Sequence, residues 1–345
     1  MAGRAAFDRE PAALRRGGGA AEDEGPAASG RRAGNDGRAD AATDTEAGRR
    51  AAVWRTARAI LSLESPRIIG ILNVTPDSFW DGGRYTGVDA AVAHAERLLA
   101  EGVDLVDVGG ESTRPGAQPV SAEEERRRVL PVLRELVRRF PDLLVSIDTV
   151  KADVAGAALA EGAAVINDVS GLRLDAGIAE TVARAGAGVV LMHSRGAVER
   201  MASYELAVYG PDPVAEISRE LGASLERARA AGIPDDAIVL DPGLGFSKRT
   251  EHSVAVIAGL HRLLALGRPV LLGPSRKRFV GELAAAQARA RDEAPAAPLP
   301  PEARLEGTIA ACVAGLFRGA RLFRVHDVDP VRRALAVADA ILAAS

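Results

Sequence analysis

Short runs rich in Val, Ile and Leu alternate with longer amphipathic segments from Val53 to the end of the chain, and this alternation limits the chain to few folds. The runs are continuously apolar, which is typical of parallel strands with helices packed on their outer face. The segments between them carry apolar residues three and four positions apart, as amphipathic helices do. The candidate strands are RIIGILNV, DLVDVGG, LLVSIDT, AVINDVSG, GVVLMH, AIVLDPG, PVLLGPS and RLFRVHDV.

Eight strand–helix units in a chain of 345 residues favour one α/β fold, the (β/α)8 TIM barrel. The alternative is an open doubly wound sheet, but no G-x-G-x-x-G motif follows any of the runs. The segment WRTARAILSLESP precedes the first run, and we expect it to form a hairpin that closes the bottom of the barrel. The Ala- and Pro-rich segment 285–303 is predicted to be a mobile surface loop.

The first 50 residues differ in composition from the rest of the chain. They consist largely of Ala, Gly, Arg and Asp, with almost no large apolar side chains that could compensate for the entropy lost on ordering. They also lack the apolar central region of a secretory signal. We therefore predict a disordered low-complexity extension at 1–50 and a barrel catalytic domain at 51–345.

The overall charge excludes several classes of partner. The chain has 44 Lys and Arg against 47 Asp and Glu, a formal net charge of -3, so no global field attracts nucleic acid or an anionic membrane. No apolar stretch approaches the roughly 20 residues that span a bilayer. Cys312 is the only cysteine, which excludes an internal disulfide and indicates a cytoplasmic location.

Almost every predicted strand ends in a polar side chain. In a TIM barrel, chemistry collects at the carboxyl ends of the strands. A purely structural barrel needs caps and turn formers there, and does not need amides, carboxylates and cations together. ILNVTPDSFWDGG therefore delivers Asn73 to a site and continues into a loop flanked by glycines. The side chains at the strand ends are Asn73, Glu111 to Arg114, Asp148, Asn167, Met192, His193, Asp241, Ser275 to Lys277, Arg324 and His326.

Seven of these motifs, in this order, resemble the dihydropteroate synthase family: ILNVTPDSFWDGG, DVGGESTRPGA, SIDT, VINDVSG, LDPGLGF, GPSRKRF and RVHDV. The resemblance covers about residues 54–344. It implies a TIM barrel, usually homodimeric, that condenses 6-hydroxymethyl-7,8-dihydropterin diphosphate with 4-aminobenzoate to give 7,8-dihydropteroate and pyrophosphate in folate synthesis. Such an enzyme is a transferase and a target of sulfonamides. Trp80 departs from the small polar residue usual in the family.

The resemblance also implies a pterin pocket with a defined chemistry. A pterin ring has apolar faces and an edge of N–H donors with one carbonyl, so its pocket needs carboxylate and amide acceptors and a cationic donor. Asp241 is expected to accept from the ring amide and exocyclic amine, and Lys277 to donate to the carbonyl side. The pterin-binding residues implied are Asp148, Asn167, Met192, Asp241, Phe246 and Lys277.

The departing diphosphate requires cations and hydrogen-bond donors. Arg324 and His326 are two residues apart on the last strand, so their side chains share one face. Mg2+ prefers oxygen ligands and keeps several waters, and the resemblance implies that Asn73 shares this cofactor with the diphosphate rather than holding it alone. The anion-binding residues implied are Asn73, Arg114, Arg324 and His326.

The resemblance places 4-aminobenzoate among Thr113, Pro115 and Ser275. The residues expected to carry the reaction are Asn73, Thr113, Arg114, Lys277, Arg324 and His326. Neutralising the leaving group is expected to dominate catalysis, so no serine or cysteine nucleophile is predicted. For His193 two interpretations stay open, a role in the site or a bond to a backbone carbonyl.

Two alternative functions are compatible with a pterin-binding barrel. A pterin-dependent methyltransferase domain also presents Asp and Asn to a pterin, but it has no need of the diphosphate motifs STRPGA, SRK and RVHDV. A non-catalytic pterin-binding paralogue is expected to lose Asn73, Arg324 or His326, and all three are present. The synthase is therefore the favoured function.

Overall fold

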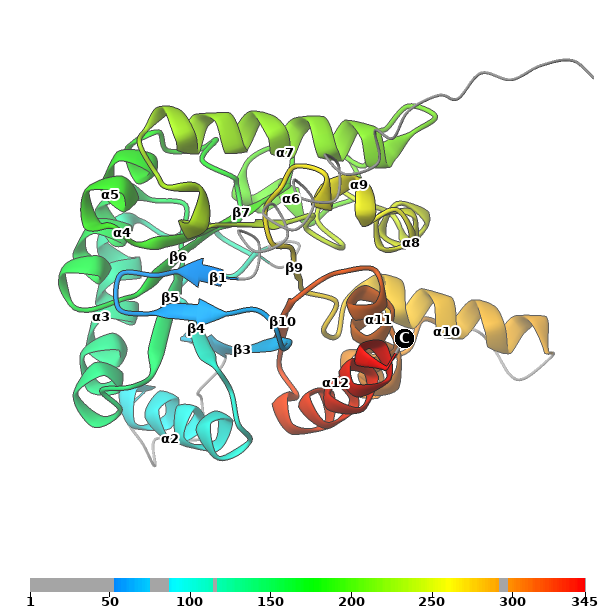
Figure 1. Cartoon of the computed structure of the whole chain (residues 1–345), viewed down its shortest axis with the longest axis horizontal. Coiled ribbons are helices and arrows are strands. Elements are labelled where there is room, and N and C mark those ends of the chain that lie inside the picture. The colour runs from blue at the N-terminus through cyan, green and yellow to red at the C-terminus, as the bar shows by residue number, and fades with distance from the viewer. Residues whose placement is uncertain (1–52, 75–86, 114–116, 292–296, 345) are drawn as a thin grey trace, which may run out of the picture. The chain divides into compact units, whose positions relative to one another are not determined.

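Eight parallel strands form a closed barrel in the computed structural model, which describes residues 53–74, 87–113, 117–291 and 297–344 (Figure 1). The strand order is β8-β7-β6-β5-β4-β3-β10-β9, and a parallel bridge between Leu240 and Val270 joins β8 to β9. All eight predicted strands and the TIM barrel are confirmed. The strands are β3 (Arg67–Asn73), β4 (Leu105–Gly109), β5 (Leu144–Asp148), β6 (Val165–Asp168), β7 (Gly188–Met192), β8 (Ile238–Asp241), β9 (Leu271–Leu272) and β10 (Leu322–Val325).

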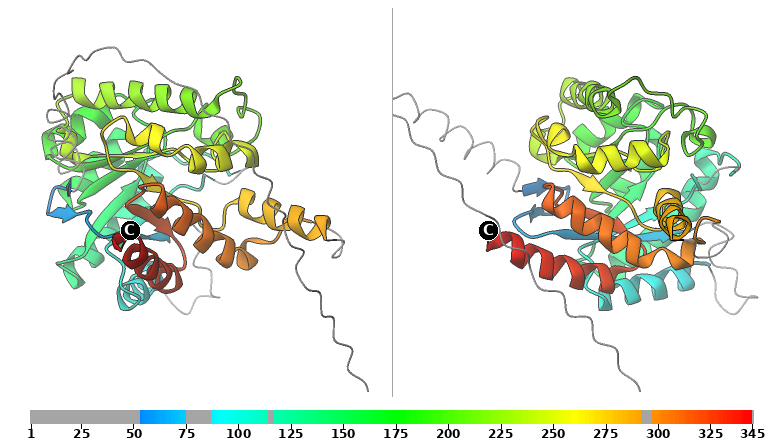
Figure 2. Two further views of the ribbon diagram at one scale, coloured as in Figure 1. Left: turned by 45° about the vertical axis from the view of Figure 1, so that its right-hand side comes forward. Right: turned by 90° about the vertical axis from the view of Figure 1, so that its right-hand side faces the viewer.

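Helices surround the strands on the outside (Figure 1). Figure 2 shows α11 and α12 running side by side along one flank of the barrel. A continuous core of Val, Leu, Ile and Ala fills the space between helices and strands. The helices are α2 (Gly87–Ala100), α3 (Ala122–Arg139), α4 (Ala152–Ala160), α5 (Gly177–Ala185), α6 (Val198–Met201), α7 (Pro213–Ala230), α8 (Thr250–Ala258), α9 (His261–Leu264), α10 (Arg278–Ala290), α11 (Leu305–Phe317) and α12 (Val328–Ala343), with 3-10 turns η2 (Asp235–Ala237) and η3 (Pro301–Ala303).

The interior of the barrel is apolar at the bottom and polar at the top. Successive side chains of a strand point to opposite faces, so every second residue faces inward. The inward residues nearest the strand starts form a separate buried cluster, in which one residue from each strand takes part. These residues are Ile69, Leu105, Leu144, Val165, Val190, Val239, Leu271 and Leu322.

The predicted bottom hairpin is confirmed. Strands β1 (Val53–Arg55) and β2 (Ile60–Ser62) pair antiparallel, with Trp54 opposite Leu61. Trp54 is fully buried in the bottom cluster, and its indole N–H donates to the carbonyl of Ala237 at 3.0 Å. A Cβ at Gly188, the first residue of β7, would lie 2.9 Å from the carbonyl oxygen of Arg55, so the hairpin approaches the barrel too closely for a larger residue.

The predicted loop at 285–303 is wrong for its first residues. Helix α10 continues to Ala290, and Pro301–Ala303 form a 3-10 turn. Ala, Gln and Arg are strong helix formers, and the expectation gave weight only to the prolines that follow them. Residues 292–296 lie outside the described residues, as does the predicted extension at 1–50, whose boundary stays a prediction. None of the helices in the described part of the chain is both long and apolar enough to cross a membrane.

Candidate active site

The inward side chains change from apolar to polar toward the carboxyl ends of the strands. Asn73, Gly109 and Asp148 are register neighbours on β3, β4 and β5, and Asp148 is opposite Asn167 of β6. A Cβ at Gly109 would lie 3.6 Å from both Asn73 Oδ1 and Asp148 Cβ, so these two side chains flank the glycine. The barrel therefore brings predicted site residues from distant segments together at the carboxyl ends of its strands. We call this end of the barrel the mouth.

Arg324 of β10 reaches across the interior of the barrel to two carboxylates. Its Nε donates to Asp107 Oδ2 at 2.6 Å, and its Nη2 donates to Asp148 Oδ2 at 3.1 Å. The side-chain exposure of Arg324, Asp107 and Asp148 is 19%, 1% and 18%, so the ion pairs are largely shielded from water. Asn167 Nδ2 also donates to Asp107 Oδ2, at 3.0 Å.

Asp241 of β8 and Lys277, which follows β9, complete the mouth beside Arg324 of β10. Gly243 donates its backbone N–H to Asp241 Oδ1 at 2.6 Å. Gly243 has a φ of 67°, and a Cβ there would overlap the carbonyl oxygen of His193, so this turn requires glycine. Lys277 Nζ lies 3.8 Å from the centroid of the Phe246 ring, a cation–π contact. Phe246 packs with Met192 in a small buried cluster, as expected for the apolar walls of the site.

Burial shifts the pKa values of the ionisable groups in this mouth. It raises the pKa of Asp148 to about 7, although the positive charge of Arg324 acts in the opposite direction. Burial likewise raises the pKa of Asp241 to about 6, against the Gly243 hydrogen bond and the charge of Lys277. The pKa of Lys277 falls to about 8, because burial and Arg324 disfavour its charged form. Such shifts are typical of functional sites.

Ser275 and His326 form a hydrogen-bonded pair at the edge of the mouth. The Ser275 hydroxyl accepts from the His326 amide at 3.1 Å and lies 2.9 Å from His326 Nδ1. If the Ser275 hydroxyl donates its hydrogen to Nδ1, the proton of the neutral His326 ring is on Nε2. Burial and the charge of Arg324 lower the pKa of His326 to about 3, so the ring is a neutral donor in the free protein.

His193 bonds to side chains and supports the wall of the site. Lys248 Nζ lies 2.7 Å from His193 Nδ1 and donates to the carbonyl of Phe246 at 3.0 Å, while His193 Nε2 lies 3.0 Å from Glu220 Oε2. Burial and the charge of Lys248 lower the pKa of His193 to about 4, and burial lowers that of Lys248 to about 7. This buried network holds the turn that carries Phe246.

Sequence reasoning missed Asp107 and Lys248. Asp107 lies inside a strand that is otherwise apolar, and a carboxylate at an inward position was the signal available. Lys248 follows a predicted motif and resembles a surface lysine in the sequence, yet the side chain is fully buried. Its burial depends on contacts with residues more than 50 positions away.

The loop after β4 is anchored at its base. Glu111 Oε1 accepts the N–H of Val120 at 2.7 Å, and Lys151 Nζ lies 2.7 Å from Glu111 Oε2 and 2.5 Å from Glu125 Oε2. Thr113 lies within this connection and is partly buried. The predicted residues Arg114 and Pro115, and the unusual Trp80, lie outside the described residues.

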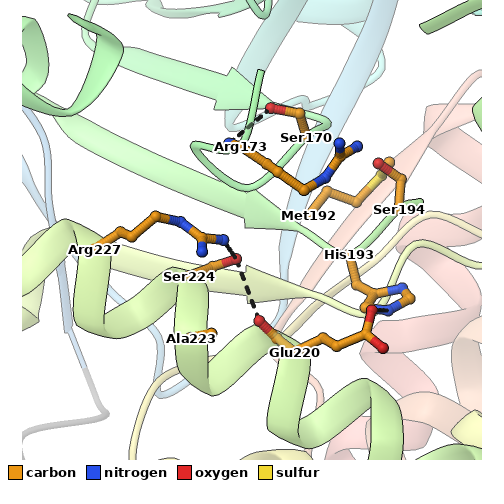
Figure 3. Close-up of a pocket in the computed structure, with 9 residues that line it drawn as sticks. All are labelled: Ser170, Arg173, Met192, His193, Ser194, Glu220, Ala223, Ser224 and Arg227. Carbon is orange, nitrogen blue, oxygen red and sulfur yellow. Dashed lines mark hydrogen bonds and ion pairs between the residues drawn. The ribbon is translucent and has the colours of Figure 1, made fainter. Parts of the chain in front are cut away.

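A cavity of about 150 Å3 lies beside the mouth, between the loop after β6 and helix α7 (Figure 3). Met192 and His193 line it, and Met192 is the one predicted pterin-binding residue among its lining side chains. Arg173, Glu220 and Arg227 contribute charged groups to its wall. The cavity thus neighbours the wall of the mouth, and Asp148, Asp241, Lys277 and Arg324 are not among its lining residues.

The described residues contain no group of three or more His, Cys, Asp or Glu side chains able to hold a metal ion. Asn73 offers an amide oxygen close to Asp148 across Gly109. This donor set suits an ion that keeps other oxygen ligands from water or substrate.

Comparison with known proteins agrees with this geometry. The sequence profile described as "Pterin binding enzyme" matches residues 69–326. Dihydropteroate synthase of Mycobacterium leprae is 45% identical over 282 residues, which cover 82% of this chain and 95% of that protein. The Xanthomonas albilineans enzyme, solved with 4-aminobenzoic acid, is 46% identical with a TM-score of 0.75, and the match covers 85% of this chain and 99% of that chain. The Yersinia pestis enzyme, solved with a sulfonamide drug, is 39% identical with a TM-score of 0.74, over 84% of this chain and 99% of that chain. The chain therefore belongs to the dihydropteroate synthase family.

Proposed function

We propose that the mouth of the barrel is where this chain joins 6-hydroxymethyl-7,8-dihydropterin diphosphate to 4-aminobenzoate. The reaction yields 7,8-dihydropteroate and pyrophosphate, and it is a transferase step of folate synthesis. The observation that carries the site assignment is the meeting of Asp148, Asp241 and Lys277 with Arg324 in one shielded space. Carboxylates suit the donor-rich pterin edge, and cations suit a phosphorylated tail.

The pterin ring is proposed to lie against Met192 and Phe246, with its edge toward the acids. Asp241 and Asp148 accept from ring N–H groups when ionised, Asn167 completes the acceptor set, and Lys277 donates to the carbonyl. These polar groups are buried or partly buried, so water solvates them poorly in the free protein. A hydrogen bond to the ring therefore adds a partner that water supplies poorly. Losing one partner of such a bond costs roughly 1 to 3 kcal/mol.

The diphosphate is proposed to meet Asn73, Arg324 and His326, together with Arg114. Arg324 supplies a guanidinium that matches phosphate oxygens, and His326 supplies a neutral N–H. Asn73 would contribute an oxygen ligand to Mg2+, and the ion, when bound, would supply positive charge beside the leaving group. 4-Aminobenzoate is proposed to lie near Thr113, Pro115 and Ser275. The sulfonamide seen with the Yersinia pestis relative supports a sulfonamide site here too.

The chemical step requires little covalent help from the protein. The lone pair of the aromatic amine forms the new C–N bond as the C–O bond breaks, its electron pair leaves with pyrophosphate, and the amine then loses a proton to solvent. The protein aligns the two substrates, which contributes on the order of 7 to 11 kcal/mol. It also stabilises the charge that develops on the leaving group.

Two further properties are proposed. The chain is proposed to form a homodimer, because Phe317 of α11 and Val337 of α12 are large apolar side chains that are 46% and 63% exposed. A cytoplasmic location is proposed because Cys312, buried and free, has no disulfide partner.

The experiment that tests the proposed function measures pyrophosphate release by the purified protein. Release is expected to require the pterin diphosphate, 4-aminobenzoate and Mg2+ together. Asp241→Ala should lower the affinity for the pterin diphosphate roughly 5- to 150-fold, the equivalent of about 1 to 3 kcal/mol. Asn73→Ala should raise the Mg2+ concentration needed for half-maximal rate.

A matched control is Asp339→Ala. Asp339 pairs with Arg321 at the start of β10, away from the mouth, so this variant should keep the wild-type rate. If the Mg2+ requirement of Asn73→Ala equals that of the unaltered protein, the metal assignment is wrong. If Asp241→Ala binds the pterin diphosphate normally, the pterin assignment is wrong.

A further inference from the structure

Asp107 is a buried carboxylate whose two oxygens differ in their hydrogen bonding. Its Oδ2 accepts from Arg324 Nε at 2.6 Å and from Asn167 Nδ2 at 3.0 Å. Its Oδ1 is also buried, but finds no hydrogen-bond partner among the described residues. An unmatched oxygen on a carboxylate that is 1% exposed is unfavourable. A second arrangement of the neighbouring donors is therefore expected to use it.

Arg324 is the donor that can supply this second arrangement. Its Nε and Nη2 lie on one edge of a rigid planar fork, and that edge matches the two oxygens of a single carboxylate. In the structure the edge is instead divided between two carboxylates, because Nε bonds to Asp107 and Nη2 bonds to Asp148 at 3.1 Å. The bond to Asp148 is the longer of the two.

The pterin competes with Arg324 for Asp148. Under the proposed function, on which this inference rests, Asp148 accepts hydrogen bonds from the edge of the ring. A ring N–H that bonds to Asp148 Oδ2 competes there with Nη2 of Arg324. The unmatched Oδ1 of Asp107 is the alternative acceptor for Nη2, on the carboxylate that already holds Nε. Nη2 of Arg324 can therefore move to Oδ1 of Asp107, and this move gives the unmatched oxygen a donor.

We propose that Asp107 is a positioning residue on which Arg324 pivots when the pterin binds. Before binding, the guanidinium bonds to both Asp107 and Asp148. After binding, its Nε and Nη2 both bond to Asp107. The Nη1 hydrogens and the remaining Nη2 hydrogen are then available to the diphosphate. Recognition of the ring at Asp148 in this way prepares the cation that receives the leaving group.

The chemistry of this position requires a carboxylate. An asparagine has one acceptor oxygen, and its NH2 group would oppose Nη2 instead of accepting from it. Asn167 already donates to the same side chain, so a second amide cannot satisfy both neighbours as well as a carboxylate does. Asp107→Asn should therefore leave the shape of the mouth in place and remove the bidentate state.

The experiment compares two ligands by calorimetric titration in the presence of Mg2+ and without 4-aminobenzoate. The ligands are 6-hydroxymethyl-7,8-dihydropterin diphosphate and the same pterin alcohol without the diphosphate. For Asp107→Asn, the affinity for the diphosphate ligand is expected to fall at least tenfold, whereas that for the alcohol should change less than threefold. The matched control is Asp104→Asn, which alters an Arg–Asp pair with Arg67 at the other end of the strands and should change neither affinity.

Equal loss of affinity for both ligands would overturn the pivot, because a carboxylate that only shapes the mouth or touches the ring affects both. Unchanged affinity for the diphosphate ligand would overturn it as well. If Asp107→Asn does not fold, Asp107→Ser is titrated in its place, because a hydroxyl offers one acceptor oxygen and cannot form the bidentate pair. The same selective loss is expected, and an equal loss for both ligands contradicts the proposal. Failure of the proposed function is distinct, since the unaltered protein would then bind neither ligand.

Discussion

At the scale of residues, the mouth concentrates charge where solvation is poor. Asp107, Asp148 and Asp241 share the space with Arg324 and Lys277. Burial disfavours the charged form of each of these groups, and neighbouring opposite charges restore it only in part. The raised pKa values of the two aspartates and the lowered pKa of Lys277 are the consequence. A substrate that supplies N–H donors and a carbonyl acceptor stabilises the charged forms of these side chains.

A pH profile tests that arrangement. Asp148 and Asp241 accept N–H groups only when ionised, and their pKa values are about 7 and about 6, so kcat/KM should fall as pH falls through that range. Lys277 donates only when protonated, and its pKa is about 8, so kcat/KM should also fall as pH rises through that value. The expected profile of kcat/KM is a bell with its maximum between about 7 and 8.

Lys277→Arg supplies the control for the alkaline limb. Arginine remains protonated across the accessible range, so any activity that this variant keeps should lose its decline above pH 8. An alkaline limb that persists unchanged would show that Lys277 is not its source. The measurement is initial rate at low pterin diphosphate across a series of buffers.

The residues found from the sequence and those missed differ in one physical respect. Asn73, Asp148 and Asp241 end their strands, so strand periodicity alone predicts that they face the mouth. Asp107 and Lys248 acquire their roles from burial by segments far away in the chain. The neutral state of His326 has the same origin, because burial and the nearby charge of Arg324 lower the pKa of its ring.

At the scale of elements, local patterns predicted most of the architecture. Continuous apolar runs predicted the eight strands, and the hairpin was predicted from the one segment WRTARAILSLESP before the first of them. Residues 285–290 of helix α10 were predicted to be loop, because these helix-forming residues were grouped with the prolines that follow them. Element boundaries depend on neighbouring contacts, such as the bond from Leu299 N–H to the carbonyl of Gly281 at 3.3 Å.

The bottom hairpin should contribute stability and not catalysis. Trp54 is fully buried and bonds to Ala237 at the start of β8, at the end of the barrel opposite the mouth. Trp54→Ala should lower the free energy of unfolding by about 3 to 5 kcal/mol, because it removes a large apolar side chain and leaves a cavity. The kcat/KM of the folded variant should stay within about twofold of wild type.

Urea denaturation followed by circular dichroism measures this loss. Trp54→Phe is the milder control, because it keeps most of the apolar contact and loses the bond to the Ala237 carbonyl, at a cost of about 1 kcal/mol for that bond. A Trp54→Ala protein as stable as wild type would show that the hairpin does not close the barrel in solution.

At the scale of the whole molecule, closure of the barrel is what turns scattered motifs into a site. The bridge between Leu240 and Val270 joins the last pair of strands, so Asp241 of β8 meets Lys277, which follows β9, at this seam. Arg324 of the neighbouring β10 lies beside them and reaches Asp148. An open sheet would have left the two halves of the mouth on separate edges. Sequence patterns predicted closure only through the number of strands, since the contacts at the seam are not local.

The outer surface carries the remaining prediction, which concerns assembly. Leu283, Phe317 and Val337 are exposed apolar side chains on the successive helices α10, α11 and α12. If two copies associate through these helices, sedimentation velocity should give about twice the chain mass of 35.9 kDa. Val337→Asp places a charge in that interface and should shift the protein toward the mass of a single chain.

Val208→Asp is the matched control, because Val208 is 72% exposed on the segment before α7 and not on these three helices. This variant should sediment as wild type does. If the unaltered protein sediments as one chain at all concentrations, the homodimer is wrong. If Val337→Asp and Val208→Asp both keep the doubled mass, the dimer exists but uses another face, and the exposed apolar side chains of α10 to α12 need a different partner.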